Sequence, residues 1–157
     1  MNEKTIALKV ADILSAIYAH SAVITMMGEN LPSPAQLPLL TADHRAALLT
    51  LVEQSCSMLS LHLCRYATDI DTAAAALEKG TVRYKLLIPA AMPESFETEL
   101  SELMKRYVAL SVLSSVTLAH SSALSTTFTA QSSQIINGIT SRLKPMPPRN
   151  LRLTHNY

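Results

Sequence analysis

Charge is scarce in this chain of 157 residues. Only 16% of the residues are Asp, Glu, Lys or Arg, against about a quarter in typical soluble domains, while 48% are apolar. The chain has no Trp, and aromatic residues make up 4%. The scarcity of aromatic residues argues against a sheet sandwich. The scarcity of charged residues means that only a small part of the surface is well suited to contact with water. The composition therefore predicts a helical subunit of a larger assembly.

Cysteine and glycine are too few for several classes of site. Cys56 and Cys64 are eight residues apart in one predicted helix, a rise of about 12 Å, which is too far for a disulfide. The three glycines stand alone, so neither a phosphate-binding loop nor a dinucleotide fingerprint exists. No spacing of His and Cys is typical of zinc, and no motif activates a Ser. We predict no cofactor, no metal and no enzymatic activity.

An enzyme is the third functional class that the sequence allows, and three residues could contribute to its active site. His20, His62 and Asp69 would serve an active site if the fold brought them together from separate elements. His20 lies on an apolar stripe, which is more typical of a buried structural histidine. Asp69 and Asp71 in "TDIDT" lack the following Gly and Glu of a calcium loop, so a capped turn is the better interpretation.

The longest run without charge lies between Arg106 and Arg142. A helix on a protein surface normally carries a charged stripe that faces water. Residues 107–124 have nearly the length of a membrane span, but residues 107–141 contain fourteen Ser or Thr and no aromatic belt. We therefore predict no membrane span, and we expect protein, most simply further copies of the chain, to cover this run.

Two helices are predicted in the first half of the chain. Apolar residues at steps of three and four mark a helix over residues 4–27, which Gly28 ends. Three prolines exclude regular helix from residues 28–40, which we expect to form an extended connection. Thr41 is a suitable N-cap for a second helix over residues 42–66.

Two more helices are predicted in the second half. Pro93 and the acids after it favour a helix start, because proline fits the first turn and acids suit the positive end of the helix dipole. We prefer a hairpin to one long helix, since "AHSS" at 119–122 has weak helix formers. A fresh apolar stripe then continues to about residue 143, and the prolines of residues 145–157 predict an extended tail.

The segment "TVRYKLLIP" is the one predicted strand. Val82, Tyr84 and Leu86 alternate with two basic residues, as in a half-buried strand. The basic outward positions and the terminal proline are typical of an edge strand. We expect it to pair with residues 67–71 or with another chain, and in the second case these three apolar residues become interaction residues.

The charges are distributed unevenly along the chain. The first 102 residues hold all twelve acids and seven bases, whereas the last 55 hold six bases and no acid. Arg142, Lys144, Arg149 and Arg152 follow the end of the last predicted helix, where bases also complement the helix dipole. Simple solvation explains this pattern equally well. The functional interpretation is that a basic tail docks on an acidic neighbouring subunit, with nucleic-acid contact as a secondary role.

The order of features from Pro89 onward resembles a known group of proteins. A short strand ends in "LLIPAAMP", an acidic helix start "ESFETELSELMKRYV" and an uncharged helix follow, and the basic "RLKPMPPR" comes last. This order resembles small structural proteins encoded in the head-to-tail gene clusters of tailed phages and prophages. The resemblance implies a non-enzymatic connector, neck or tail-completion subunit that forms a ring, with Arg142, Lys144 and Arg149 as interaction residues.

Together these features predict a mainly α fold with four principal helices and one short β strand or hairpin. We expect one helical domain over residues 1–144 and a basic, proline-rich tail over residues 145–157. The predicted function is a ring-forming structural subunit of a phage virion, found in the virion or in the bacterial cytoplasm during assembly. The alternative is a small cytoplasmic helical-bundle adaptor for one protein partner. The N-terminal sequence "MNEKTIALK" does not resemble a secretion signal, which agrees with a cytoplasmic origin.

Overall fold

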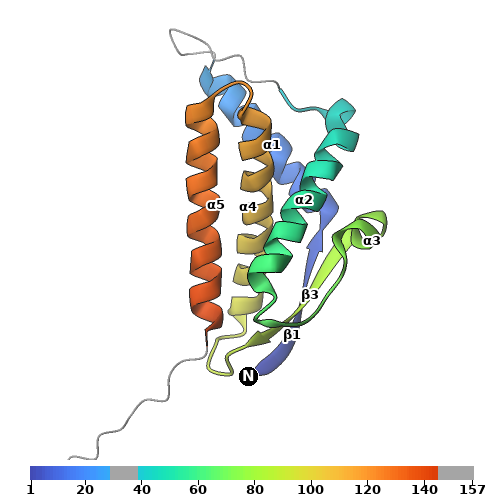
Figure 1. Cartoon of the computed structure of the whole chain (residues 1–157), viewed down its shortest axis with the longest axis vertical. Helices are drawn as coiled ribbons and strands as arrows, with labels where there is room; N and C mark the ends of the chain where they lie inside the picture. Colours follow the sequence, from blue (N-terminus) through green and yellow to red (C-terminus); the bar gives the residue numbers. More distant parts are fainter. Residues whose placement is uncertain (29–38, 145–157) are drawn as a thin grey trace, which may run out of the picture.

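The fold is mainly α, with four long helices and a small antiparallel sheet (Figure 1). The computed structural model describes residues 1–28 and 39–144. The elements follow the chain in this order: β1 (Asn2–Lys9), α1 (Val10–Gly28), a 3-10 turn (Ala42–His44), α2 (Arg45–Leu63), β2 (Ala67–Ile70), α3 (Ala73–Glu78), β3 (Thr81–Ile88), α4 (Ser95–Thr117) and α5 (Ser122–Leu143).

The sheet has the strand order β1-β3-β2, with both neighbours antiparallel to β3. The predicted strand is confirmed as β3, and its predicted partner at residues 67–71 is confirmed as β2. The prediction that it is an edge strand is wrong. Because β1 occupies its other side, Val82, Tyr84 and Leu86 face the core and are 0% exposed. These three residues therefore belong to the hydrophobic core and are not available to another chain.

Residues 2–9 form a strand where the apolar spacing predicted a helix over residues 4–27. Ile6 and Leu8 point to the core, and the strand pairs with β3 from Asn2 opposite Ile88 to Lys9 opposite Thr81. Ile6 continues the spacing of the apolar residues in the helix, which is why the sequence predicted helix here. The backbone hydrogen bonds between β1 and β3 stabilise a strand instead. The helix itself begins at Val10 and ends, as predicted, at Gly28.

One face of the sheet is covered and the other is open. Helices α4 and α1 pack against β1, α3 packs against β3, and the Tyr84 hydroxyl of β3 reaches the Cys56 carbonyl of α2. Helix α4 lies at the centre of the helices, with α1, α2 and α5 packed around it (Figure 1). The strands alternate accordingly, since Val82 is buried while Arg83 and Lys85 are exposed. The largest fully buried side chains come from all of these layers: Tyr84, Leu8, Ile13, Ile17, Leu48, Leu59, Leu63, Leu86, Leu100, Met104, Leu110 and Leu113.

The second half of the chain folds as the predicted hairpin. Helix α4 ends at Thr117, and α5 begins at Ser122 after a short turn. The Ser121 hydroxyl accepts a hydrogen bond from the backbone N–H of Leu124 at 3.4 Å, so this serine is the N-cap of α5. The weak helix formers in this segment therefore mark the turn correctly.

Four further sequence predictions concern the first half of the chain. Cys56 is confirmed as a core residue at 0% exposure, and Thr41 is confirmed as the N-cap of the turn that leads into α2. The buried position predicted for His20 is wrong, since this side chain is exposed on α1. Ser21 accepts a hydrogen bond from the backbone N–H of Leu40 at 3.0 Å, which ties the start of the α2 region to α1. Most of the predicted extended connection, residues 29–38, lies outside the described residues.

The core of α4 should dominate the stability of the fold. We expect Leu100→Ala to lower the free energy of unfolding by about 2–5 kcal/mol, because it leaves a cavity where Leu100 is 0% exposed. Leu118→Ala at the end of the same helix, where the side chain is 65% exposed, should change it by less than about 0.5 kcal/mol. Urea denaturation at one fixed protein concentration measures both. Equal effects of the two variants would contradict the packing described for α4.

Candidate interaction surface

The outer face of α5 is exposed and carries no charge. Helix α5 packs along α4 and for a short part on α2, and Phe128, Ile136, Ile139 and Leu143 are buried there. The opposite side of the helix faces away from the protein. We call the exposed, uncharged residues on it the α5 face: Ser122, Ala123, Thr126, Thr127, Ala130, Gln131, Ser133, Gln134, Asn137 and Ser141.

Part of the hydroxyl-rich run is used inside the hairpin. Ser114 on α4 lies 2.7 Å from the Thr129 hydroxyl, and the Ser125 hydroxyl donates to the Ser114 backbone carbonyl at 2.9 Å. Ser125 and Ser132 are both buried, and their small side chains allow the two helices to pack closely. Much of the uncharged run is thus covered within a single chain, in the second half of α4 and on the inner side of α5. Coverage of the α5 face by further copies stays a prediction.

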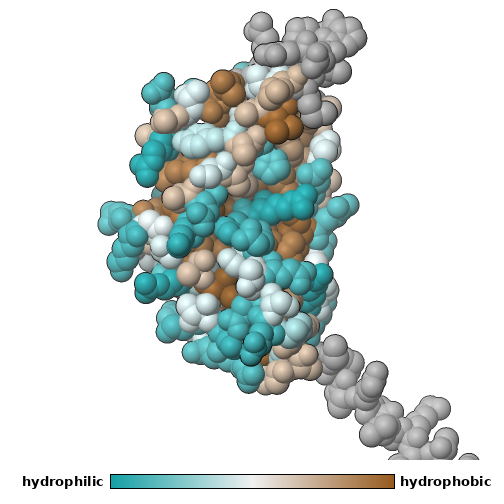
Figure 2. Space-filling model, turned by 180° about the vertical axis from the view of Figure 1, so that it is seen from behind, coloured by the Kyte–Doolittle hydropathy of each residue, from teal (hydrophilic) through white to brown (hydrophobic). Residues whose placement is uncertain are grey.

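A group of charged side chains lies away from the α5 face, between α1 and α4. Figure 2, the view from behind, shows hydrophilic residues across the middle of the face that contains α1 and β1. Lys105 on α4 lies within ion-pair distance of Asp12 on α1 and of Glu102 on its own helix. Together with His20 and Arg106, these residues line a groove of about 340 Å³ between α1 and α4. Charged side chains therefore gather in the groove between α1 and α4, whereas the α5 face has none.

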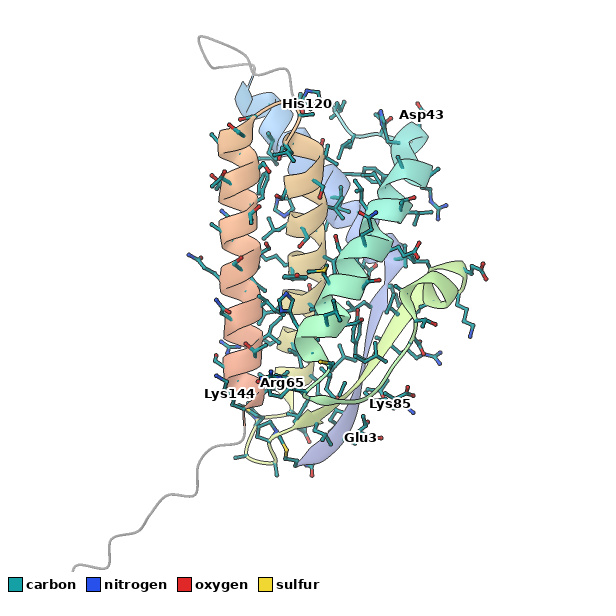
Figure 3. The ribbon with its side chains drawn as sticks, in the orientation of Figure 1. Glu3, Asp43, Arg65, Lys85, His120 and Lys144 are labelled. Carbon is teal, nitrogen blue, oxygen red and sulfur yellow. The ribbon has the colours of Figure 1, made fainter. Side chains whose placement is uncertain are left out.

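The basic residues predicted for interaction are only partly within the described chain. Arg142 in the last turn of α5 forms an ion pair with Glu99 on α4, which fastens the end of the hairpin. Lys144 is exposed directly after α5, at the end of the molecule where β1 begins (Figure 3). Arg149 and Arg152 lie outside the described residues, as does the predicted tail of residues 145–157. Docking through these bases stays a prediction.

The residues considered for an active site have separate surroundings. His20 lies in the α1–α4 groove, His62 packs edge-on against the Tyr107 ring at 6.1 Å, and Asp69 on β2 pairs with Lys85 at 3.2 Å. No hydrogen bond or ion pair joins any two of these three candidates in the described part of the chain. The region that the structure describes also contains no group of three or more His, Cys, Asp or Glu with the arrangement of a metal site.

The two strongest electrostatic perturbations lie in the core. Burial raises the pKa of the Cys56 thiol to about 11, and burial together with the neighbouring Cys56 raises the pKa of Tyr84 still further above its ordinary value. The Tyr84 hydroxyl donates a 3.4 Å hydrogen bond to the backbone carbonyl of Cys56. Both groups are therefore neutral and structural at physiological pH.

One helical stretch among the described residues meets the length and composition of a membrane span. It runs from Ala42 to Leu63, and its buried stripe includes Val52, Cys56 and Leu59. A single such helix is weak support for a membrane span, because core helices of soluble proteins have the same composition. Residues 107–124, which the sequence analysis considered as a span, do not combine the helix length and composition that a span needs.

No family model, curated protein or solved structure matches the chain.

The different surroundings of the two cysteines give a chemical test of the core. A disulfide reagent at neutral pH should label the exposed Cys64 and leave the buried Cys56 unmodified until the protein unfolds. Cys64→Ser should abolish native labelling, and Cys56→Ser is the matched control that should preserve it. Because the folded thiol of Cys56 ionises only near pH 11, its contribution to stability falls as pH rises above the ordinary thiol value of 9.0. Rapid native labelling of Cys56 would contradict its core position.

Proposed function

We propose that this protein is a non-enzymatic structural subunit that assembles with copies of itself, with the α5 face as a contact surface. The observation that supports this most directly is the lack of charge along α5. Helix α5 has no charged residue from Ser122 to Ser141, although one whole side of it is exposed. Soluble monomers normally place charges on such a helix face. A contact between subunits removes the need for them.

The chemistry of the α5 face suits helix packing between subunits. The helix of 22 residues is about 33 Å long, and Ala and small hydroxyl side chains along it let a second helix approach closely. Many of the hydroxyls, including those of Thr126 and Thr127, already donate to carbonyls one turn back in their own helix. Covering them therefore leaves few donors unsatisfied. No charge would have to be stripped of water along the centre of the contact.

We place this assembly in the head-to-tail region of a phage virion on the basis of the resemblance from Pro89 onward. The order of a buried strand, an acidic helix start, an uncharged helix and a basic end supports that placement. The protein would then occur in purified particles, where peptide mass spectrometry detects it. A protein that is monomeric at every concentration would instead favour the alternative, an adaptor that uses the α5 face for one different partner.

Charge placed on the α5 face tests the proposed contact. We expect the double variant Gln131→Glu/Gln134→Glu to reduce the mass of the assembly in light scattering across a dilution series. Both side chains are exposed, so the changes add two carboxylates per subunit without altering the core. High salt should partly restore the mass by screening the repulsion.

The neutral double variant Gln131→Asn/Gln134→Asn is the matched control and should assemble like the unchanged protein. Circular dichroism should show the same helix content for all three proteins. Full assembly of the charged variant at low salt would contradict the role of the α5 face.

The tail is tested by its removal. We expect deletion of residues 145–157 to leave the thermal unfolding transition unchanged, because the described core ends with Leu143. The same deletion should weaken assembly if the basic tail extends the contact to a neighbouring subunit. Light scattering of the full and shortened chains over the same dilution series gives the comparison. An unchanged mass at every dilution would rule out the docking role.

A further inference from the structure

The outer edge of β1 is the longest unpaired strand edge among the described residues. β1 has eight residues, whereas the other edge strand, β2, has four and an irregular register between Ala67 and Asp69. Irregular or very short edge strands resist pairing with other chains, but long and regular ones invite it. β1 contains no proline or bulge, and its middle residues, from Thr5 to Leu8, carry no charge.

The hydrogen-bond pattern identifies the free backbone groups of this edge. The N–H of Asp71 donates to the Arg83 carbonyl at 3.0 Å and that of Leu87 to the Tyr66 carbonyl at 2.7 Å, so odd-numbered residues of β3 bond toward β2. The even-numbered residues of β3 then bond toward β1, as the Val10 to Gly80 hydrogen bond also indicates.

In the β1–β3 register, even-numbered residues of β3 stand opposite even-numbered residues of β1. Glu3, Thr5, Ala7 and Lys9 therefore direct their backbone N–H and C=O groups away from the sheet. All four residues are exposed. They form a row of donors and acceptors that another strand can satisfy.

A groove runs beside this edge. It has a volume of about 240 Å³ and lies between residues 5–7 of β1 and the first half of α4, where Thr98 and Ser101 contribute small side chains. Its two carboxylates are already neutralised, because Lys4 lies 2.6 Å from Glu97 and Lys105 pairs with Glu102. The groove thus leaves room for a strand to approach without an unpaired charge.

We propose that two copies of the chain pair antiparallel through β1 about a two-fold axis at Ile6, which joins their sheets into one of six strands. This inference rests on the proposed function, since it supplies one contact of the homo-oligomer. Antiparallel edge pairing is isologous, so each interaction occurs twice. The occupant of the groove is then the same segment of a second copy.

Charge complementarity selects the second copy and this register. Hydrogen bonds require the outward, odd-numbered residues to stand opposite one another. With the axis at Ile6, Glu3 faces Lys9 of the partner subunit, and Thr5 faces Ala7 of the partner subunit. Lys9 has no ion-pair partner within the described chain, and Glu3 accepts only an exposed 2.7 Å hydrogen bond from Thr68. The pairing therefore provides two new opposite-charge pairs on the open face of the sheet.

A charge-swap cycle tests the pairing. Glu3→Lys alone and Lys9→Glu alone place like charges opposite each other twice, and each should raise the dimer dissociation constant about tenfold or more at low salt. The double variant Glu3→Lys/Lys9→Glu restores opposite charges and should return to within about threefold of the unchanged protein. Sedimentation velocity measures all four proteins. A double variant as weak as the single ones would overturn the proposed register.

Proline gives a second, independent test. Thr5→Pro removes one outward N–H per subunit, while the β1–β3 ladder uses the even-numbered residues and stays intact. It should abolish the dimer contact, and Thr5→Val, which keeps the N–H, should not. Unchanged association of a folded Thr5→Pro protein would overturn the pairing. If this variant fails to fold, the charge-swap cycle still decides.

The outcomes separate this inference from the proposed function. If the protein assembles and only the α5 variants reduce its mass, the β1 pairing is wrong and the proposed function stands. Sensitivity to the β1 variants alone, with dimers as the only species, would support the pairing and remove the α5 face from the assembly. A protein that is monomeric at every concentration would overturn both.

Discussion

The antiparallel pairing of β1 with β3 is the constraint on which the other elements depend. It joins residues 2–9 to residues 81–88, so the chain must close a loop of more than seventy residues before the pairing contributes any free energy. Once formed, it fixes which side chains of both strands face inward. Ile6, Leu8, Val82 and Tyr84 then make a continuous apolar floor, on which α4 lies and around which α1 and α2 pack.

The same pairing decides which surfaces are left over. Because β1 takes one side of β3 and β2 takes the other, the basic strand that looked like an edge becomes the centre of the sheet. The free edge passes to β1, whose own sequence gives little sign of it. Helix α5, which packs mainly on α4, is left at the outside with one exposed side. Both proposed contact surfaces therefore follow from one long-range pairing.

Local features of the sequence predicted the second half of the fold well. The alternation around Tyr84 gave β3, and the weak helix formers near Ser121 gave the turn of the α4–α5 hairpin, because both signals are contained within a few residues. β1 was missed because Ile6 continues the helical spacing of Ile13 and Ile17, while its strand signal consists only of Ile6 and Leu8. No local pattern reveals a partner strand about eighty residues away.

The candidate surface was only half predictable for a related reason. The run without charge from Tyr107 to Ser141 covers the second half of α4 and nearly all of α5, and composition alone cannot tell which of these two parts is buried. In the structure the second half of α4, from Tyr107 onward, is mostly buried against its neighbouring helices, so burial explains the lack of charge there. The lack of charge on α5 needs a different explanation. The alternation of Glu3, Thr5, Ala7 and Lys9 is the one sequence signal of the β1 edge. It can be interpreted only when the pairing with β3 is known, because that pairing decides which residues of β1 direct their backbone groups outward.

The two proposed surfaces have different symmetry consequences. Pairing through β1 is isologous and closes on itself, so it yields dimers and nothing larger. A ring needs a second contact, and the α5 face can supply one because it belongs to another element and does not overlap the β1 edge. If the α5 face meets a different surface of the next subunit, the contact is heterologous and repeats around an axis. A ring built in this way from β1-linked dimers uses both the free strand edge and the uncharged helix, which are the two features that an isolated monomer leaves without a partner.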